Sequence, residues 1–270
     1  MRTSLIILTA AITLLTLATP TIPAQELAVA PPGSPRLTFD IIVIHPSNPD
    51  DKGGFIKPMP SGRGYLVQNI PVRLLISLMY KIPQRQITGG PHWLDTEPFD
   101  IEAKADKAYT VDDLHTMFQD LLADRFNLKF HVDKKEGNIY ALTIDGSGLK
   151  MKPNTSPPNY AISVQPTGFA SITGTRVSMR YLCWQLGQFL QDDHRPVINF
   201  TGLTGNYDFK LEFLPPNLPP GIDKASLPPG FLDRPSLFTA LREQLGLKLK
   251  AQKGPVTYFV IDHIDKPTEN

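Results

Sequence analysis

The chain has 270 residues, of which 27 are Lys or Arg and 26 are Asp or Glu, so its formal charge at pH 7 is +1. This balance lacks the basic excess with which proteins bind nucleic acids or anionic membrane surfaces, and it argues against both as partners. A single cysteine, Cys183, excludes an internal disulfide, so stability is expected to come from packed apolar cores.

The first 24 residues have the layout of a secretory signal peptide. Arg2 is followed by an apolar run from Leu5 to Ala18, and then by small residues and prolines up to Ala24. The apolar run is shorter than the roughly 18 to 20 residues that a membrane-spanning helix needs. We therefore expect cleavage near Ala24, a periplasmic or secreted location, and no integral membrane segment in the mature chain. Loss of Arg2, the one charged residue of this segment, changes the formal charge from +1 to 0.

Residues 25–35 are predicted to form a flexible N-terminal segment, and residues 36–151 a first folded lobe. In this lobe the apolar residues of "NIPVRLLISLMY" at 69–80 recur at helical spacing. A glycine-containing turn follows, and "PFDIEAK" at 98–104 predicts a strand. The first lobe is therefore expected to combine helices with strands.

The first lobe is predicted to close with a helix and a hairpin. Thr110 with Asp113 is a plausible helix start, and Asn127 tolerates the left-handed conformation that ends helices. After Asn127, apolar and polar residues alternate as they do in a strand with one solvated face. We interpret Glu136-Gly137-Asn138 as a turn that returns the chain in a second strand.

A second lobe is predicted after the proline-rich connector "KPNTSPPN" at 152–159, because its sequence repeats the order of the first. Within residues 160–266, "RVSMRYLCWQLG" at 176–187 parallels the helix at 69–80, and "NYDFKLEF" at 206–213 parallels the strand at 98–104. Asp233 with Ser236 is a plausible start of a last helix, which is expected to end at Gly246, before a hairpin with its turn at Lys253-Gly254-Pro255.

These patterns predict the α+β class, with two tandem pseudo-repeat lobes that each pack helices on one face of a mostly antiparallel sheet. A proline-rich insertion at 214–235 interrupts the second lobe. It is interpreted either as a solvated spacer in extended conformation or as a mobile flap that docks a partner.

Three segments resemble the hallmarks of a known family: "GGPHWLDTEPFDIEAKAD" at 89–106, "LLADRFNLKFHVDKKEGNIYALTI" at 121–144 and "HRPVINFTGLTGNYDFKLEFLPP" at 194–216. Over nearly all of its mature length the chain is similar to a large family of exported proteins of unknown function, expanded in soil acidobacteria such as Solibacter. The resemblance implies an extracytoplasmic protein and supplies no catalytic residue. The sequence departs from the family pattern at Asn199-Phe200, where an Asp followed by a polar residue is usual.

The sequence lacks the usual signatures of catalysis. Ser147 and Lys150 match the S-x-x-K motif of penicillin-recognising serine enzymes, but they lie in a glycine loop, and the K-T-G and S-D-N elements do not occur. The chain has no G-x-S-x-G elbow, H-E-x-x-H helix, Walker loop or Rossmann glycine run. Cys183, beside Leu182 and Trp184, is interpreted as a small packed residue. We expect no cofactor.

Side chains suited to ligand contact occur in two short stretches. Trp93, beside His92, could form an aromatic surface together with Trp184. Asp192-Asp193-His194 has oxygen and nitrogen donors, but a zinc site needs three or four ligands that converge from fixed elements, so no metal site is predicted. The candidate ligand-binding residues are therefore His92, Trp93, Asp192, Asp193 and His194.

The sequence favours a non-enzymatic extracytoplasmic binding or interaction module that recognises a protein, peptide or cell-wall ligand, between its lobes or along a sheet edge. The expected partner is an envelope protein or a cell-wall ligand. The alternative is an extracytoplasmic hydrolase that acts on a cell-envelope polymer or peptide through residues scattered over both lobes.

Overall fold

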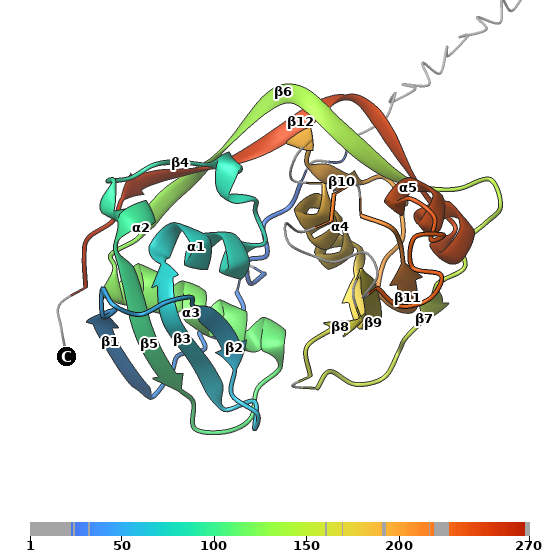
Figure 1. The fold of residues 1–270 in the computed structure, drawn as a ribbon. Coiled ribbons are helices and arrows are strands. Elements are labelled where there is room, and N and C mark those ends of the chain that lie inside the picture. The colour runs from blue at the N-terminus through green and yellow to red at the C-terminus, as the bar shows by residue number, and fades with distance from the viewer. Residues whose placement is uncertain are drawn as a thin grey trace, which may run out of the picture.

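Two lobes lie side by side beneath a long two-stranded ribbon in the computed structural model of the chain (Figure 1). The structure describes residue 23 and residues 25–31, 33–159, 161–168, 170–190, 193–215, 217–218 and 227–267. The predicted signal peptide, apart from Pro23, and the candidate residue Asp192 lie outside the described residues, as does part of the proline-rich insertion. Within the described ranges, no helix has the length and apolar character needed to span a membrane.

The first lobe consists of an antiparallel sheet with helices on one face (Figure 1). The sheet has the order β1-β5-β3-β2, from strands β1 (Ile41–Pro46), β2 (Phe55–Pro58), β3 (Gly64–Pro71) and β5 (Pro98–Lys104). Its helices are α1 (Val72–Tyr80), α2 (Trp93–Thr96) and α3 (Val111–Arg125). The Thr110 side chain caps α3 as predicted, because it accepts a hydrogen bond from the Asp113 N–H.

The second lobe has the same design. Its sheet has the order β7-β11-β9-β8, from strands β7 (Lys152–Pro153), β8 (Val164–Gly168), β9 (Ser171–Ser178) and β11 (Asn206–Glu212). Its helices are α4 (Met179–Phe189), α5 (Leu237–Ala240) and the π-helical turn η4 (Leu241–Leu245). The Ser236 side chain caps α5, and Gly246 ends η4 in the left-handed conformation. The first two residues of the predicted connector form β7.

The two sheets share a local backbone feature as well as their strand order. Asn69 in β3 and Arg176 in β9 both have positive φ angles, of 52° and 54°. The carboxylate of Asp100 accepts a hydrogen bond from the Asn69 N–H at 2.8 Å, and the carboxylate of Asp208 accepts one from the Arg176 N–H at 2.9 Å. In each lobe an aspartate therefore stabilises a left-handed residue that few side chains tolerate. The predicted α+β class is confirmed.

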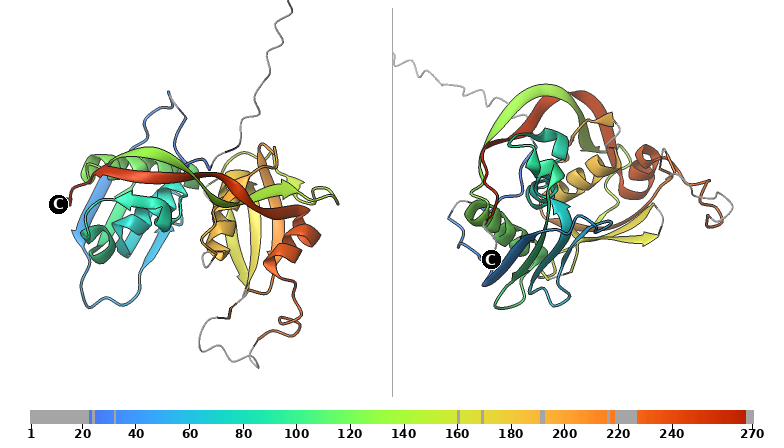
Figure 2. Two further views of the ribbon diagram at one scale, coloured as in Figure 1. Left: turned by 90° about the horizontal axis from the view of Figure 1, so that it is seen from above. Right: turned by 60° about the vertical axis from the view of Figure 1, so that its left-hand side comes forward.

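The two predicted hairpins are wrong. The segments read as hairpins are single strands, β6 (Lys129–Ile144) and β12 (Leu247–His263), which pair with each other antiparallel. Short strands β4 (Ile87–Gly89) and β10 (Val197–Asn199) add to the outer edges in parallel, giving the order β10-β6-β12-β4. Seen from above, the ribbon of β6 and β12 crosses both lobes (Figure 2).

The glycines that indicated turns serve close packing within the ribbon. Gly137 and Gly254 lie opposite each other, and neither has a positive φ. A Cβ atom on Gly254 would lie 2.5 Å from Cδ1 of Ile139, and one on Gly137 would lie 2.8 Å from Cγ2 of Val256. The missing side chains thus leave room for Ile139 and Val256, which form a small apolar cluster with Ile198.

The ribbon completes the cores of both lobes. Phe259 and Ile261, near the end of β12, pack in the core of the first lobe, although they are remote from it in sequence. Tyr140 and Leu142, in the second half of β6, pack in the core of the second lobe. Neither lobe therefore contains its whole core within its own stretch of sequence.

Replacement of Phe259 tests this arrangement. Its ring is fully buried and stacks on that of Phe130 at a centroid distance of 3.9 Å. Phe259→Ala is expected to lower the free energy of unfolding by about 3–5 kcal/mol, because it leaves a cavity in the first core. Urea unfolding should remain a single transition by circular dichroism and by tryptophan fluorescence, since the lobes share the ribbon.

The matched control is Lys253→Ala, at an exposed position of the same strand, which should change the free energy of unfolding by less than about 0.5 kcal/mol. A first lobe that unfolds unchanged in Phe259→Ala while the rest of the chain is destabilised would contradict the shared core.

Candidate functional site

Residues 25–31, a segment without helix or strand of its own, lie between the two lobes. Main-chain groups of this segment bond to both lobes. The Ala28 N–H donates to the Tyr80 carbonyl at 2.9 Å, and the Leu27 carbonyl accepts from Nη1 of Arg180 on α4 at 3.2 Å. The Gln25 carbonyl accepts from Oγ1 of Thr257 on the ribbon at 2.8 Å. We call the space that holds this segment the groove.

Few side chains of the segment hold it in place. Leu27 packs against the core of the first lobe, and the Gln25 side chain accepts from Nε2 of Gln86 at 2.7 Å. The side-chain amide of Gln119 donates to the Ala28 carbonyl as well as to a carbonyl of α1. Val29 is exposed. The groove therefore holds one apolar side chain and a row of backbone groups.

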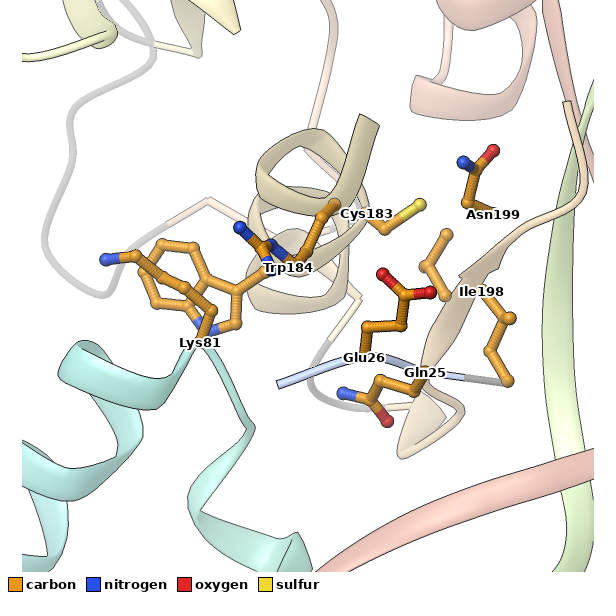
Figure 3. A pocket seen from close by; sticks show the side chains of 9 residues that line it. Gln25, Glu26, Lys81, Cys183, Trp184, Ile198 and Asn199 are labelled. Carbon is orange, nitrogen blue, oxygen red and sulfur yellow. The ribbon is translucent and has the colours of Figure 1, made fainter. Parts of the chain in front are cut away.

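Open space flanks the segment on both sides. One cavity, of about 80 Å³, is bordered by Gln25 and Glu26, by Cys183 and Trp184 of α4, and by residues 197–199 of β10. Figure 3 shows Gln25 and Glu26 between α4 and the strand that carries Ile198 and Asn199. A second cavity, of about 510 Å³, lies along residues 28–31 and the start of α3. The segment therefore does not fill the groove.

Lys81 carries a buried charge at the junction of the lobes. It ends α1 in the left-handed conformation, with a φ of 54°, and only 6% of its surface is exposed. Its Nζ atom lies 4.8 Å and 5.2 Å from the ring centroids of Trp184 and Tyr181 on α4. The first lobe thus places a cation against two aromatic rings of the second.

Burial lowers the pKa of Lys81 from its ordinary value of 10.5 to about 7. Asp112 on α3 opposes this shift, and Arg180 on α4 adds to it. Burial also lowers the pKa of the neighbouring His115, and the charge of Lys81 lowers it further. The Nε2 atom of His115 lies 2.8 Å from the hydroxyl oxygen of Tyr65. His115 is therefore neutral at pH 7 and has a structural hydrogen bond.

Cys183 borders the smaller cavity but is poorly suited to act as a nucleophile. It is buried, and burial raises the pKa of its thiol to about 12, so that almost no thiolate exists near neutral pH. The Nε1 atom of the adjacent Trp184 is buried and has no hydrogen-bond partner among the described residues. This wall of the groove can bind through apolar and aromatic contacts.

The structure places the four sequence-predicted site residues that it describes, His92, Trp93, Asp193 and His194, outside the groove. His92 is exposed, and Trp93 is half-buried against the first core, with its ring 6.1 Å from that of Phe99. Asp193 accepts from the Tyr140 hydroxyl at 2.7 Å and pairs with Arg195. The exposed His194 offers its carbonyl to Arg85 Nε at 3.1 Å.

Trp93, Asp193 and His194 therefore have contacts that stabilise the fold, whereas His92 is exposed. His92 and Trp93 come shortly after β4 in the chain, and Asp193 and His194 come shortly before β10. These two strands form the opposite edges of the ribbon sheet. The described residues contain no group of three His, Cys, Asp or Glu side chains that could hold a metal ion.

The S-x-x-K sequence also has a structural explanation. Asp145 accepts hydrogen bonds from the N–H and the hydroxyl of Ser147, which forms a tight turn. Nζ of Lys150 donates to the Glu243 carbonyl at 2.8 Å, near the end of η4. The Ser147 side chain therefore stabilises the loop itself, and the Lys150 side chain joins the loop to the second lobe.

Sequence reasoning missed Lys81, Arg180 and the docked segment, and it identified Trp184 only as one half of an aromatic surface. A signal for Lys81 was available, because a lysine between Tyr80 and Ile82, at the end of an apolar helix, has little chance of reaching solvent. The position of residues 25–31 has no comparable signal, since that segment contains small residues and prolines without periodicity.

The shifted pKa of Lys81 predicts a pH dependence of stability. Because the folded chain binds this proton less tightly than the unfolded chain, the contribution of Lys81 to the free energy of unfolding should rise as the pH increases from about 7 towards 10.5, by a few kcal/mol at most. Lys81→Met should remove this rise, as measured by urea unfolding between about pH 6.5 and about pH 9.5. Lys248→Met, at an exposed position, is the control. An unchanged slope in Lys81→Met would show that Lys81 titrates normally.

Comparison with known proteins identifies the family of the chain and nothing closer. Neither the curated proteins nor the solved structures gave a match. The model of a family described as proteins of unknown function (DUF3738) matches residues 73–264, a range that contains the second core, the whole ribbon and the part of the first core after Val72, but not the docked segment. Because this match spans more than half of its length, the chain belongs to the DUF3738 family.

Proposed function

We propose that the protein is a non-enzymatic extracytoplasmic binding module that takes up a segment of a protein or peptide in the groove between its lobes. The observation that carries this proposal is the docking of residues 25–31, which serve as a built-in example of the ligand. Both lobes bond to main-chain groups of that segment, and such bonds do not depend on side-chain identity.

The groove has the features that recognition of a polypeptide requires. Its Leu27 socket selects an apolar side chain, and Gln119 and Arg180 donate to carbonyl groups that any peptide has. The cavities of about 80 and about 510 Å³ beside the segment leave room for a ligand bulkier than residues 25–31. A partner segment would exchange with the chain's own segment.

The extracytoplasmic location in this proposal rests on the predicted signal peptide. Arg2, the apolar run and the small residues before Gln25 support export, as does the resemblance to an exported family expanded in soil acidobacteria. Cleavage near Ala24 would release the end of the segment that lies in the groove. The ligand would then be an envelope protein or a peptide.

The alternative, an envelope hydrolase, has weaker support. A hydrolase needs a nucleophile or an activated water beside a base. Cys183, which borders the groove, has a thiol with a raised pKa, and His115, the histidine that borders the groove, is buried and lies within hydrogen-bond distance of the Tyr65 hydroxyl. These properties favour binding over catalysis.

A peptide supplied in trans tests the proposal. The probe is a fluorescein-labelled hexapeptide with the sequence of residues 25–30, Gln-Glu-Leu-Ala-Val-Ala. In the mature wild-type chain, residues 25–31 (the tethered segment) compete with the peptide for the groove. Because they belong to the same chain, their effective concentration is high, so the peptide should bind weakly. Leu27→Asp should loosen the tethered segment and strengthen peptide binding at least about tenfold, as measured by fluorescence anisotropy.

Val43→Asp is the matched control, because it places the same charge at an exposed aliphatic position on β1. It should leave the affinity for the hexapeptide at the wild-type value. The proposal fails if Leu27→Asp keeps its native circular dichroism spectrum and yet binds the peptide no better than Val43→Asp does.

A further inference from the structure

A small cavity lies at the junction of the lobes, beside the position of Ala28. We call it the seam cavity. Its volume is about 30 Å³, enough for about two atoms of the size of water. It shares residues with two wider cavities, of about 280 and about 510 Å³, and both of these also border Asp112. A ligand in the groove can therefore place a small group in the seam cavity and its body outside.

The lining of the seam cavity is strongly basic. Lys81 comes from the first lobe, Arg176 and Arg180 come from the second, and Asp112 is the acidic residue among the described lining residues. In the described part of the chain, none of the three cations forms an ion pair with a carboxylate. Arg176 and Arg180 donate instead to the backbone carbonyls of Ser156 and Leu27.

Lys81 makes this excess of positive charge costly. It is more than nine-tenths buried, and its charge faces the rings of Tyr181 and Trp184; Asp112 favours that charge from a distance but forms no ion pair with it among the described residues. Contact with aromatic rings offsets only part of the desolvation of a buried ammonium group. An anion in the seam cavity would supply the missing partner.

The backbone holds two of these cations in unusual conformations. Lys81 and Arg176 both have φ angles of 54°, which are unfavourable for residues other than Gly and Asn. Asn69 occupies the place of Arg176 in the first lobe, where its amide group donates to carbonyls of the adjacent loop. The left-handed backbone position is thus common to both lobes, whereas a cationic side chain at that position occurs in the second lobe and not in the first.

We infer that the seam cavity binds a carboxylate group of the ligand, between Lys81 and the guanidinium groups of Arg176 and Arg180. This inference rests on the proposed function and adds to it the chemical class of the ligand: a polypeptide with an acidic side chain, or a C-terminus, at the position that Ala28 takes in the tethered segment. The two oxygens of a carboxylate match the size of the cavity, and a planar guanidinium group suits their geometry.

Peptides that differ by one charge test the inference in trans. The Leu27→Asp chain is titrated with Gln-Glu-Leu-Glu-Val-Ala and with Gln-Glu-Leu-Gln-Val-Ala, which place Glu or Gln at the position of Ala28. The Glu peptide should bind at least about tenfold more tightly, a difference of about 1.4 kcal/mol. In the Leu27→Asp/Lys81→Met chain this ratio should fall to about one. Equal affinities in a chain that binds both peptides would overturn the inference.

A second pair of peptides separates the two sources of a carboxylate. Gln-Glu-Leu-Ala is supplied with a free C-terminal carboxylate and with a C-terminal amide. Tighter binding of the free acid would identify a C-terminus as the ligand group. Tighter binding of the Glu hexapeptide alone would identify an acidic side chain.

A test in cis stands even if no peptide binds in trans. Ala28→Glu and Ala28→Gln are made in the full mature chain, where the tethered segment brings the new side chain to the seam cavity. The Glu variant should have the higher ratio of folded to unfolded chain at pH 7, by about tenfold, and this difference should vanish in the Lys81→Met background. A Glu variant no more stable than the Gln variant would overturn the inference, whereas a failure of all peptides alone would overturn only the proposed function.

Discussion

The antiparallel pairing of β6 with β12 holds the two lobes in one molecule, because each strand gives one end to each core. Tyr140 and Phe259 lie far apart in sequence from most of the residues they pack against. Their burial fixes the position of one lobe relative to the other. The groove, which needs a carbonyl acceptor from α1 and donors from α3, α4 and the ribbon within reach of one segment, exists only because of that fixed position.

Local signals in the sequence located the longer helices and one interior strand of each lobe's sheet, and they failed for the ribbon. Thr110 and Ser236 cap helices, and residues 98–104 form a strand, because side-chain capping and alternation act over a few residues. Gly137 and Gly254 lie in short segments with the composition of turns, but the structure places them opposite each other in continuous strands. Whether a glycine turns a chain or makes room for a neighbour depends on a strand more than a hundred residues away, which local pattern does not reveal.

The candidate site was less predictable than the fold, for a related reason. The residues chosen from the sequence, such as Trp93 and Asp193, have the chemistry of ligand contact, but the structure uses them to pack a core and to bond to Tyr140. The groove residues come from distant segments and include main-chain groups, which leave no mark in a sequence. Lys81 is the exception, since a lysine in apolar surroundings has to be explained by its environment.

The shared ribbon also sets the order in which the chain can fold. The first lobe lacks Phe259 and Ile261 until the last few residues have been synthesised, so it has no complete core to collapse around while the chain is still growing. Contacts between residues near 130 and residues near 260 give the fold a high contact order, and such folds form slowly. Under the proposed export, which would thread the chain unfolded through a membrane, late completion would keep it competent for transport until its C-terminus arrives.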